Sequence, residues 1–156
     1  MLLKISYLIK MPFIGFNFDR ISAERKIDDN KFKGNISVKH NLNIIDLKEE
    51  KVSLDKTQEV LKFTFEFLLN YEPEVGIIKI NGHLLFLDSS KRMKELIQEW
   101  KKNKKLPPEI MQGLFNTALT KSNIKALQLS QDINLPPHLP MPKLMREKKS
   151  VNEYIG

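Results

Sequence analysis

The strongest constraint on the fold is the alternating stretch VLKFTFEFLLNY at residues 60–71. Every second side chain of this stretch is large and apolar, and most of the side chains between them are polar. A period of two residues is typical of a β-strand with one buried face, because successive side chains of a strand point to opposite sides of the sheet. The buried face is expected to consist of Leu61, Phe63, Phe65, Phe67, Leu69 and Tyr71.

A second long apolar stretch, GIIKINGHLLFL at residues 76–87, follows a turn that contains Pro73. Asn-Gly at residues 81–82 commonly forms a two-residue hairpin turn, which would split this stretch into two short strands. We favour one continuous strand, because two short strands would leave half of the aromatic strand at residues 60–71 unpaired. Gly82 is then expected to mark a bulge or a bend.

Two further strands are predicted upstream. GNISVKHNLNI places apolar side chains at even positions, from Ile36 to Ile44. In the preceding segment the apolar parity changes between Phe18 and Ile21, which indicates a strand that is bulged midway. The four predicted strands cover about residues 13–26, 34–48, 59–71 and 75–87 and form an antiparallel sheet.

Beyond residue 88 the apolar period changes to that of a helix. Ser89 or Ser90 can cap a first helix, which ends before Pro107, and a second helix of about 24 residues follows. The second helix has a seam of apolar and small side chains that could pack on the sheet or on another subunit. The candidate oligomer-interface residues are Phe115, Ala118, Leu119, Ser122, Ala126 and Leu129. The predicted class is α+β, with a four-stranded antiparallel sheet followed by two C-terminal helices.

The segment INLPPHLPMPKL at residues 133–144 holds four of the chain's eight prolines. Proline fixes its own φ and disfavours helix at the residue before it, so an extended strip should follow the long helix. The strip could be a strap that packs on the domain or a docking face for a partner. We favour the strap, because apolar residues beside a long amphipathic helix are more often packed than displayed.

The length of 156 residues suits one domain, which we expect to span residues 1–144 and to be followed by a flexible tail at residues 145–156. Residues 1–10 carry lysines and are too few to span a bilayer; they are either an extra edge strand or an artefact of a start site before Met11. The absence of cysteine excludes disulfides and thiol catalysis. We expect a cytoplasmic protein with no membrane partner.

Catalytic and metal-binding motifs are missing. The three histidines are scattered, although His40 and His83 could face each other across the sheet, and the acidic pairs at residues 28–29 and 49–50 fall in polar stretches expected to be loops. No phosphate-binding loop or nucleophile elbow appears. We therefore expect no enzymatic activity, no cofactor and no metal.

Charge and apolar surface are the remaining signals. Residues 91–105 contain seven basic and two acidic side chains, and so carry a net charge of +5 of the chain's +7. A solvated lysine face is the commoner meaning of such a run, and a nucleic-acid contact is the alternative. The candidate polypeptide-binding residues are the aromatics of the N-terminal third, Phe13, Phe16, Phe18 and Phe32, although all of them could belong to the core or to a subunit interface.

The order of elements resembles SecB, the export chaperone that holds unfolded polypeptides, and its uncharacterised SecB-like relatives in prokaryotes. The residues that carry the resemblance are FNFDRISAERK, FEFLLNYEPEVGIIKINGHLLF and FNTALTKSNIKALQLSQDINLPPHLPMPKL, within residues 13–144. The resemblance implies a non-enzymatic chaperone that binds unfolded polypeptides in aromatic grooves and assembles as a homotetramer, a dimer of dimers. It leaves a role in protein export open, but bacterial SecB is acidic where it engages the export motor and this chain is basic, so motor docking is not expected.

Two other functions stay open at this point. The lysine-rich helix at residues 91–105 could make the chain a nucleic-acid or ribonucleoprotein accessory module. Alternatively, the chain could be an assembly subunit without a ligand, with every aromatic buried at an interface.

Overall fold

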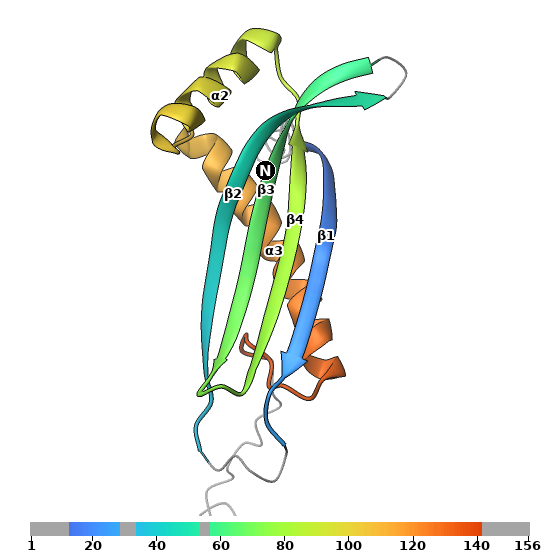
Figure 1. Ribbon diagram of the computed structural model, residues 1–156, viewed down its shortest axis with the longest axis vertical. Helices are drawn as coiled ribbons and strands as arrows, with labels where there is room; N and C mark the ends of the chain where they lie inside the picture. Colours follow the sequence, from blue (N-terminus) through green and yellow to red (C-terminus); the bar gives the residue numbers. More distant parts are fainter. Residues whose placement is uncertain (1–12, 29–33, 54–56, 142–156) are drawn as a thin grey trace, which may run out of the picture.

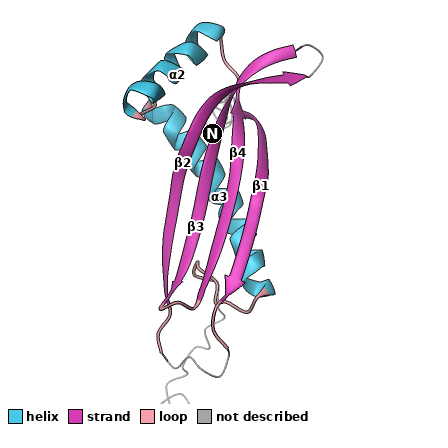
Figure 2. Ribbon diagram, in the orientation of Figure 1, coloured by secondary structure: helices cyan, strands magenta, loops and turns pink. Residues whose placement is uncertain are grey.

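The computed structural model describes residues 13–28, 34–53 and 57–141, which form a four-stranded antiparallel sheet with two helices on one of its faces (Figures 1 and 2). This confirms the predicted α+β class. The strands are β1 (Phe13–Arg25), β2 (Ser37–Ser53), β3 (Thr57–Glu72) and β4 (Gly76–Phe86). The helices are α2 (Ser90–Asn103) and α3 (Pro108–Asp132).

The sheet has the strand order β1-β4-β3-β2, so the two apolar strands lie at its centre. β3 and β4 pair without interruption from Leu61 opposite Phe86 to Tyr71 opposite Gly76. The continuous strand predicted at residues 76–87 is therefore confirmed, and Asn81 and Gly82 lie within it. β1 and β2 form the two edges, and within the described residues neither has a strand on its outer side.

The predicted bulge at Gly82 is wrong, because the bulge lies in the neighbouring strand. Gly82 pairs regularly with Phe18 and Phe65, whereas the register of β1 shifts between Phe18 and Arg20. The extra residue, Asp19, changes the parity of β1, so Phe18 and Ile21 face the same side of the sheet. This explains the change of apolar parity seen in the sequence. β2 has a similar shift between Ile44 and Asp46.

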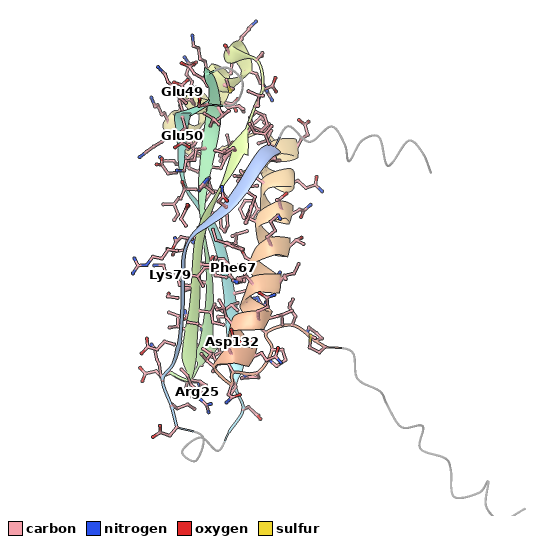
Figure 3. The ribbon with its side chains drawn as sticks, turned by 90° about the vertical axis from the view of Figure 1, so that its right-hand side faces the viewer. Arg25, Glu49, Glu50, Phe67, Lys79 and Asp132 are labelled. Atoms are coloured by element: carbon pink, nitrogen blue, oxygen red, sulfur yellow. The ribbon has the colours of Figure 1, made fainter. Side chains whose placement is uncertain are left out.

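The core lies between the sheet and α3. The predicted buried face of β3 is confirmed, since all six of its side chains are at most 1% exposed. Figure 3 shows Phe67 between the sheet and α3 and Lys79 on the opposite side of the sheet. α3 meets the sheet through the buried residues Gly113, Leu114, Ala118, Ser122, Ala126 and Ser130. Because most of these side chains are small, the helix can approach the large aromatics of β3 closely.

The other face of the sheet is polar. Lys79 Nζ lies 3.0 Å from Glu66 Oε2, and this lysine, together with Asn81, lowers the pKa of the Glu66 carboxyl. His83 Nδ1 lies 2.8 Å from Asp19 Oδ2 on the same face. The uncovered face therefore offers paired charges rather than an apolar groove.

The β2–β3 hairpin is longer than predicted. Glu49 and Glu50 lie within β2, where they pair with Leu61 and Val60, so the predicted loop at these residues is wrong. The strand continues there because ladder pairing with β3 outweighs the polar composition of one edge strand. Of the other acidic pair, Asp28 follows β1, and residue 29 lies outside the described residues.

α2 covers one end of the sheet through Met93, Leu96 and Trp100. The predicted cap is confirmed, because the Ser89 side chain accepts a hydrogen bond from the Arg92 backbone N–H. The helix ends at Lys104, whose φ of 55° is left-handed. α2 presents its lysines to solvent.

The chain after α3 folds back as a strap, which we define as residues 135–141 (Figure 1). Leu135 is 5% exposed, and its backbone N–H donates to Ser130 O over 2.8 Å. The Tyr71 hydroxyl donates to the carbonyl of Pro136 over 2.9 Å. These contacts confirm the strap interpretation for the first half of the proline strip. The last residues of the strip and the predicted tail at residues 145–156 lie outside the described residues.

Candidate functional site

A groove of about 300 Å³ lies along the edge of the helix layer where α3 passes β1. We call it the β1 groove. Phe16 and Phe18 of β1 form one wall, and Ile124 with its neighbours on α3 forms the other. The groove is lined by Phe16, Phe18, Lys121, Ile124, Lys125 and Gln128. Because β1 is an edge strand, no further strand of the described chain covers this side.

The aromatic wall of the β1 groove is held by the core. The Phe16 ring stacks on Phe65 with centroids 5.6 Å apart, and Phe18 meets Phe16 edge to face at 5.0 Å. Both phenylalanines are half-buried, so each has one side fixed in the core and another available to the groove. A rigid wall of this kind loses little conformational entropy when a ligand packs on it.

Two lysines line the β1 groove together with its apolar side chains. Lys121 Nζ lies 5.1 Å from the centroid of the Phe16 ring, a cation–π contact. Lys125 follows one helical turn later and lines the same groove. Within the described part of the chain, neither lysine has an ion pair with a carboxylate. The groove therefore combines apolar surface with two unneutralised positive charges.

A second hollow lies beside the strap. It has a volume of about 460 Å³, and Gln128 lines both hollows. Leu127 and Met141 give it apolar walls, and Met141 is 51% exposed. The second hollow is therefore a separate, largely apolar surface near the strap.

The predicted polypeptide-binding residues have different positions. Phe16 and Phe18 come together in the β1 groove. Phe13 instead packs edge to face on Phe86, with centroids 5.6 Å apart, and does not line the groove. Phe32 lies outside the described residues. Sequence reasoning missed the α3 side of the groove, because its residues look like the ordinary polar face of an amphipathic helix.

The predicted oligomer seam is partly wrong. Ala118, Ser122 and Ala126 are 0% exposed because they face the sheet of their own chain, so they cannot contact another subunit. Leu129 lies one turn after Lys125 on the side of α3 toward β1, whereas Phe115 and Leu119 lie on the opposite flank. Of these, Leu119 is 36% exposed. The seam was misread because small residues suit helix–sheet packing as well as helix–helix packing.

The predicted pairing of His40 with His83 is wrong, since the two histidines lie on opposite faces of the sheet. His40 is instead close to His138 of the strap, with ring centroids 5.3 Å apart. The His138 Nε2–H donates to Asn123 Oδ1 over 2.9 Å, and its Nδ1 is buried without a partner in the described chain. The sequence alone could not show this pair, because it forms only when the strap folds back.

Burial and the neighbouring His40 lower the pKa of His138 from 6.5 to about 4. The unfolded chain therefore binds more protons than the folded chain between these pH values, and the free energy of unfolding should fall as the pH falls through this window. We expect His138 to contribute a loss of about 1 to 3 kcal/mol between pH 6.5 and 4.

Urea unfolding at pH 7 and near pH 4.5, for the wild type and His138→Gln, measures this contribution. The variant has no titrating group at this position, so the loss of stability on acidification should be smaller than in the wild type. Equal losses in the two proteins would show that His138 is not responsible.

The remaining surfaces give little sign of chemistry. Among the described residues, no three histidine, aspartate or glutamate side chains are placed to share a metal ion. A hollow of about 450 Å³ between α2 and β2 is lined by Leu47, Ile97 and charged side chains. No helix of the described chain is long and apolar enough to cross a membrane.

Comparison with known proteins finds a similarity at the level of structure. No family model and no curated protein matches the sequence. Among solved structures, the chain is similar to the SecB-like chaperone Rv1957 of Mycobacterium tuberculosis, in complex with a ChAD peptide from the HigA1 antitoxin Rv1956. The two chains share 12% sequence identity with a TM-score of 0.48, over 89% of this chain and 95% of the other. The similarity does not assign the chain to the SecB family.

Proposed function

We propose that this chain is a non-enzymatic, SecB-like chaperone that holds unfolded polypeptides, with the β1 groove as a binding site. The observation that carries the proposal is the apolar surface along β1 and α3, which the described chain leaves uncovered. Ile124, which lines the groove together with two aromatic rings fixed by the core, is 56% exposed. A contiguous apolar surface of this kind is typical of an interaction site.

Shape and lining support a polypeptide rather than a small molecule. The β1 groove is open and is lined by the exposed Ile124, whereas small-molecule sites are usually enclosed and contain several convergent polar groups. Aromatic and aliphatic side chains beside an edge strand can accept apolar residues of an extended chain. Cytoplasmic location and participation in protein export belong to the same proposal and rest on the resemblance.

Replacing Ile124 by glutamine should weaken client holding about fivefold, because the variant removes an apolar contact of about 1 kcal/mol from the lining of the groove. The matched control is Ile45→Gln, since Ile45 is 50% exposed but lies in β2, at the other edge of the sheet. Suppression of aggregation of a chemically denatured client measures holding.

Both variants should keep the wild-type free energy of unfolding within about 0.5 kcal/mol, because both side chains are exposed. The proposal fails if the wild type does not suppress aggregation. It also fails if Ile45→Gln weakens holding as much as Ile124→Gln does.

A second candidate is a nucleic-acid accessory module that uses α2. Exposed lysines on this helix favour it, and they are Lys91, Lys94, Lys101 and Lys102. Salt separates the two functions, because phosphate contacts weaken steeply with ionic strength whereas apolar holding does not. Binding of RNA that disappears at high salt, without suppression of aggregation, would support the second candidate.

The homo-oligomer, a tetramer, remains part of the proposal. Two features support it. In the described chain no strand pairs with the outer edge of β1 or β2, and open sheet edges commonly pair with another chain. The flank of α3 that carries Leu119 is also exposed. Phe115 and Leu119 are the candidate contacts that the fold leaves available on that flank. Light scattering measures the mass of the oligomer, and a tetramer is the expected result.

A further inference from the structure

We infer that the β1 groove selects polypeptide segments in which apolar side chains are flanked by carboxylates. This inference deepens the proposed function and rests on it. The occupant is a segment of another polypeptide, with its apolar residues between Phe16, Phe18 and Ile124 and its acidic residues near Lys121 and Lys125.

Charge complementarity carries the inference. The lining of the groove contains two ammonium groups and no carboxylate. Neither lysine is neutralised by an ion pair within the described residues, so a bound carboxylate would not have to compete with one of them. The Lys121 ammonium lies over the Phe16 ring, so a carboxylate of the bound segment can meet it while neighbouring apolar side chains contact Phe16 and Phe18.

The chain's own end segments and a second copy of the chain complement the positive charge of the β1 groove less well. Residues 1–12 of the chain carry two lysines and no acidic residue, and residues 142–156 carry four basic and two acidic residues. Both segments are net positive and would face Lys121 and Lys125 with like charge. A second copy that presented the same groove to the first would bring these lysines together, which is unfavourable for the same reason.

Fluorescence anisotropy with three labelled peptides of about 12 residues tests the selectivity. The peptides share the same leucine and phenylalanine residues and carry glutamate, glutamine or lysine between them. At about 0.05 M salt the full-length chain should bind the glutamate peptide about five- to tenfold more tightly than the lysine peptide. At about 0.5 M salt the ratio should fall below about threefold, because exposed charges are then screened.

The variant Lys121→Gln with Lys125→Gln should lose the preference and keep its affinity for the glutamine peptide. The matched control, Lys91→Gln with Lys102→Gln, removes the same charge from α2 and should keep the preference. If the control loses it equally, the preference comes from the net charge of the chain and the inference is wrong. It is also wrong if the preference survives the loss of Lys121 and Lys125.

Failure of the inference can be distinguished from failure of the proposed function. If all three peptides bind equally and Ile124→Gln weakens all of them, the groove holds polypeptide without charge selection. If no peptide binds, the proposed function fails as well. A second copy would then be the occupant if the wild type self-associates and Ile124→Gln abolishes the association. The chain's own end would be the occupant if deletion of residues 142–156 restores peptide binding.

Discussion

Leu135→Ala should lower the free energy of unfolding by about 2 to 5 kcal/mol, which is the usual cost of truncating a buried leucine. Leu135 is the first residue of the strap and is 5% exposed. Its side chain packs where a Cβ on Gly76 would lie only 2.9 Å from Leu135 Cδ1, so the absence of a side chain at Gly76 leaves room for the leucine. The truncation would leave a cavity between the strap and the sheet.

The matched control is Met141→Ala at the other end of the strap. Met141 is exposed, so its truncation should change the free energy of unfolding by less than about 0.5 kcal/mol. Urea unfolding of the two variants beside the wild type measures both effects. An unchanged midpoint for Leu135→Ala would show that the strap does not hold the domain together and would restore the docking-face interpretation of the proline strip.

The fold could be predicted from the sequence because each element carries its own period. β3 alternates large apolar and polar side chains over most of its length, and α2 is preceded by Ser89, a residue type that favours the cap position. Such signals depend on the geometry of the backbone within a few residues. The length match between β3 and β4 also correctly predicted that Asn81 and Gly82 lie within one continuous strand, against the local turn signal.

The β1 groove could be predicted only in part, because its two walls come from segments about 100 residues apart in the chain. Phe16 and Phe18 stood out as aromatics of an N-terminal strand. Lys121, Ile124 and Lys125 did not, because their place beside β1 depends on how α3 crosses the sheet. The small residues of α3 pack against the aromatics of β3 and so fix that crossing. The periodicity of either segment alone does not reveal this long-range contact.

The misread oligomer seam has the same origin. A line of Ala118, Ser122 and Ala126 allows close approach of any neighbour, and the pattern does not say whether the neighbour is a helix or a sheet. The large aromatics of β3 need a cover within the same chain, and α3 is the element that supplies it. The contact between His40 and His138 likewise follows from the return of the strap over β2 and not from the spacing of histidines.

Gly82 is the position where the sheet should tolerate a side chain least. It lies in regular pairing between Phe18 of β1 and Phe65 of β3, next to the bulge at Asp19. A Cβ at residue 82 would lie 2.6 Å from the backbone oxygen of Asn17 and 2.6 Å from Phe65 Cζ. The first of these atoms belongs to the backbone, and the Phe65 ring is fully buried, so neither can move without disturbing the sheet or the core.

Gly82→Val should therefore lower the free energy of unfolding by at least about 3 kcal/mol, at the upper end of the cost of overpacking a core, because β1 must shift away from β4 or Phe65 must leave its position. The matched control is Gly15→Val on the polar face of β1, where a Cβ would first meet Leu85 Cδ1 at 3.2 Å, a flexible side chain. Gly15 follows a register shift of β1, but its backbone does not have a positive φ, so the control should unfold within about 0.5 kcal/mol of the wild type.

Urea unfolding compares the two variants. Equal stability of Gly82→Val and Gly15→Val would mean that β1 is not packed against β4 at Gly82 as described, and the Phe16 and Phe18 wall of the β1 groove would then lose its support.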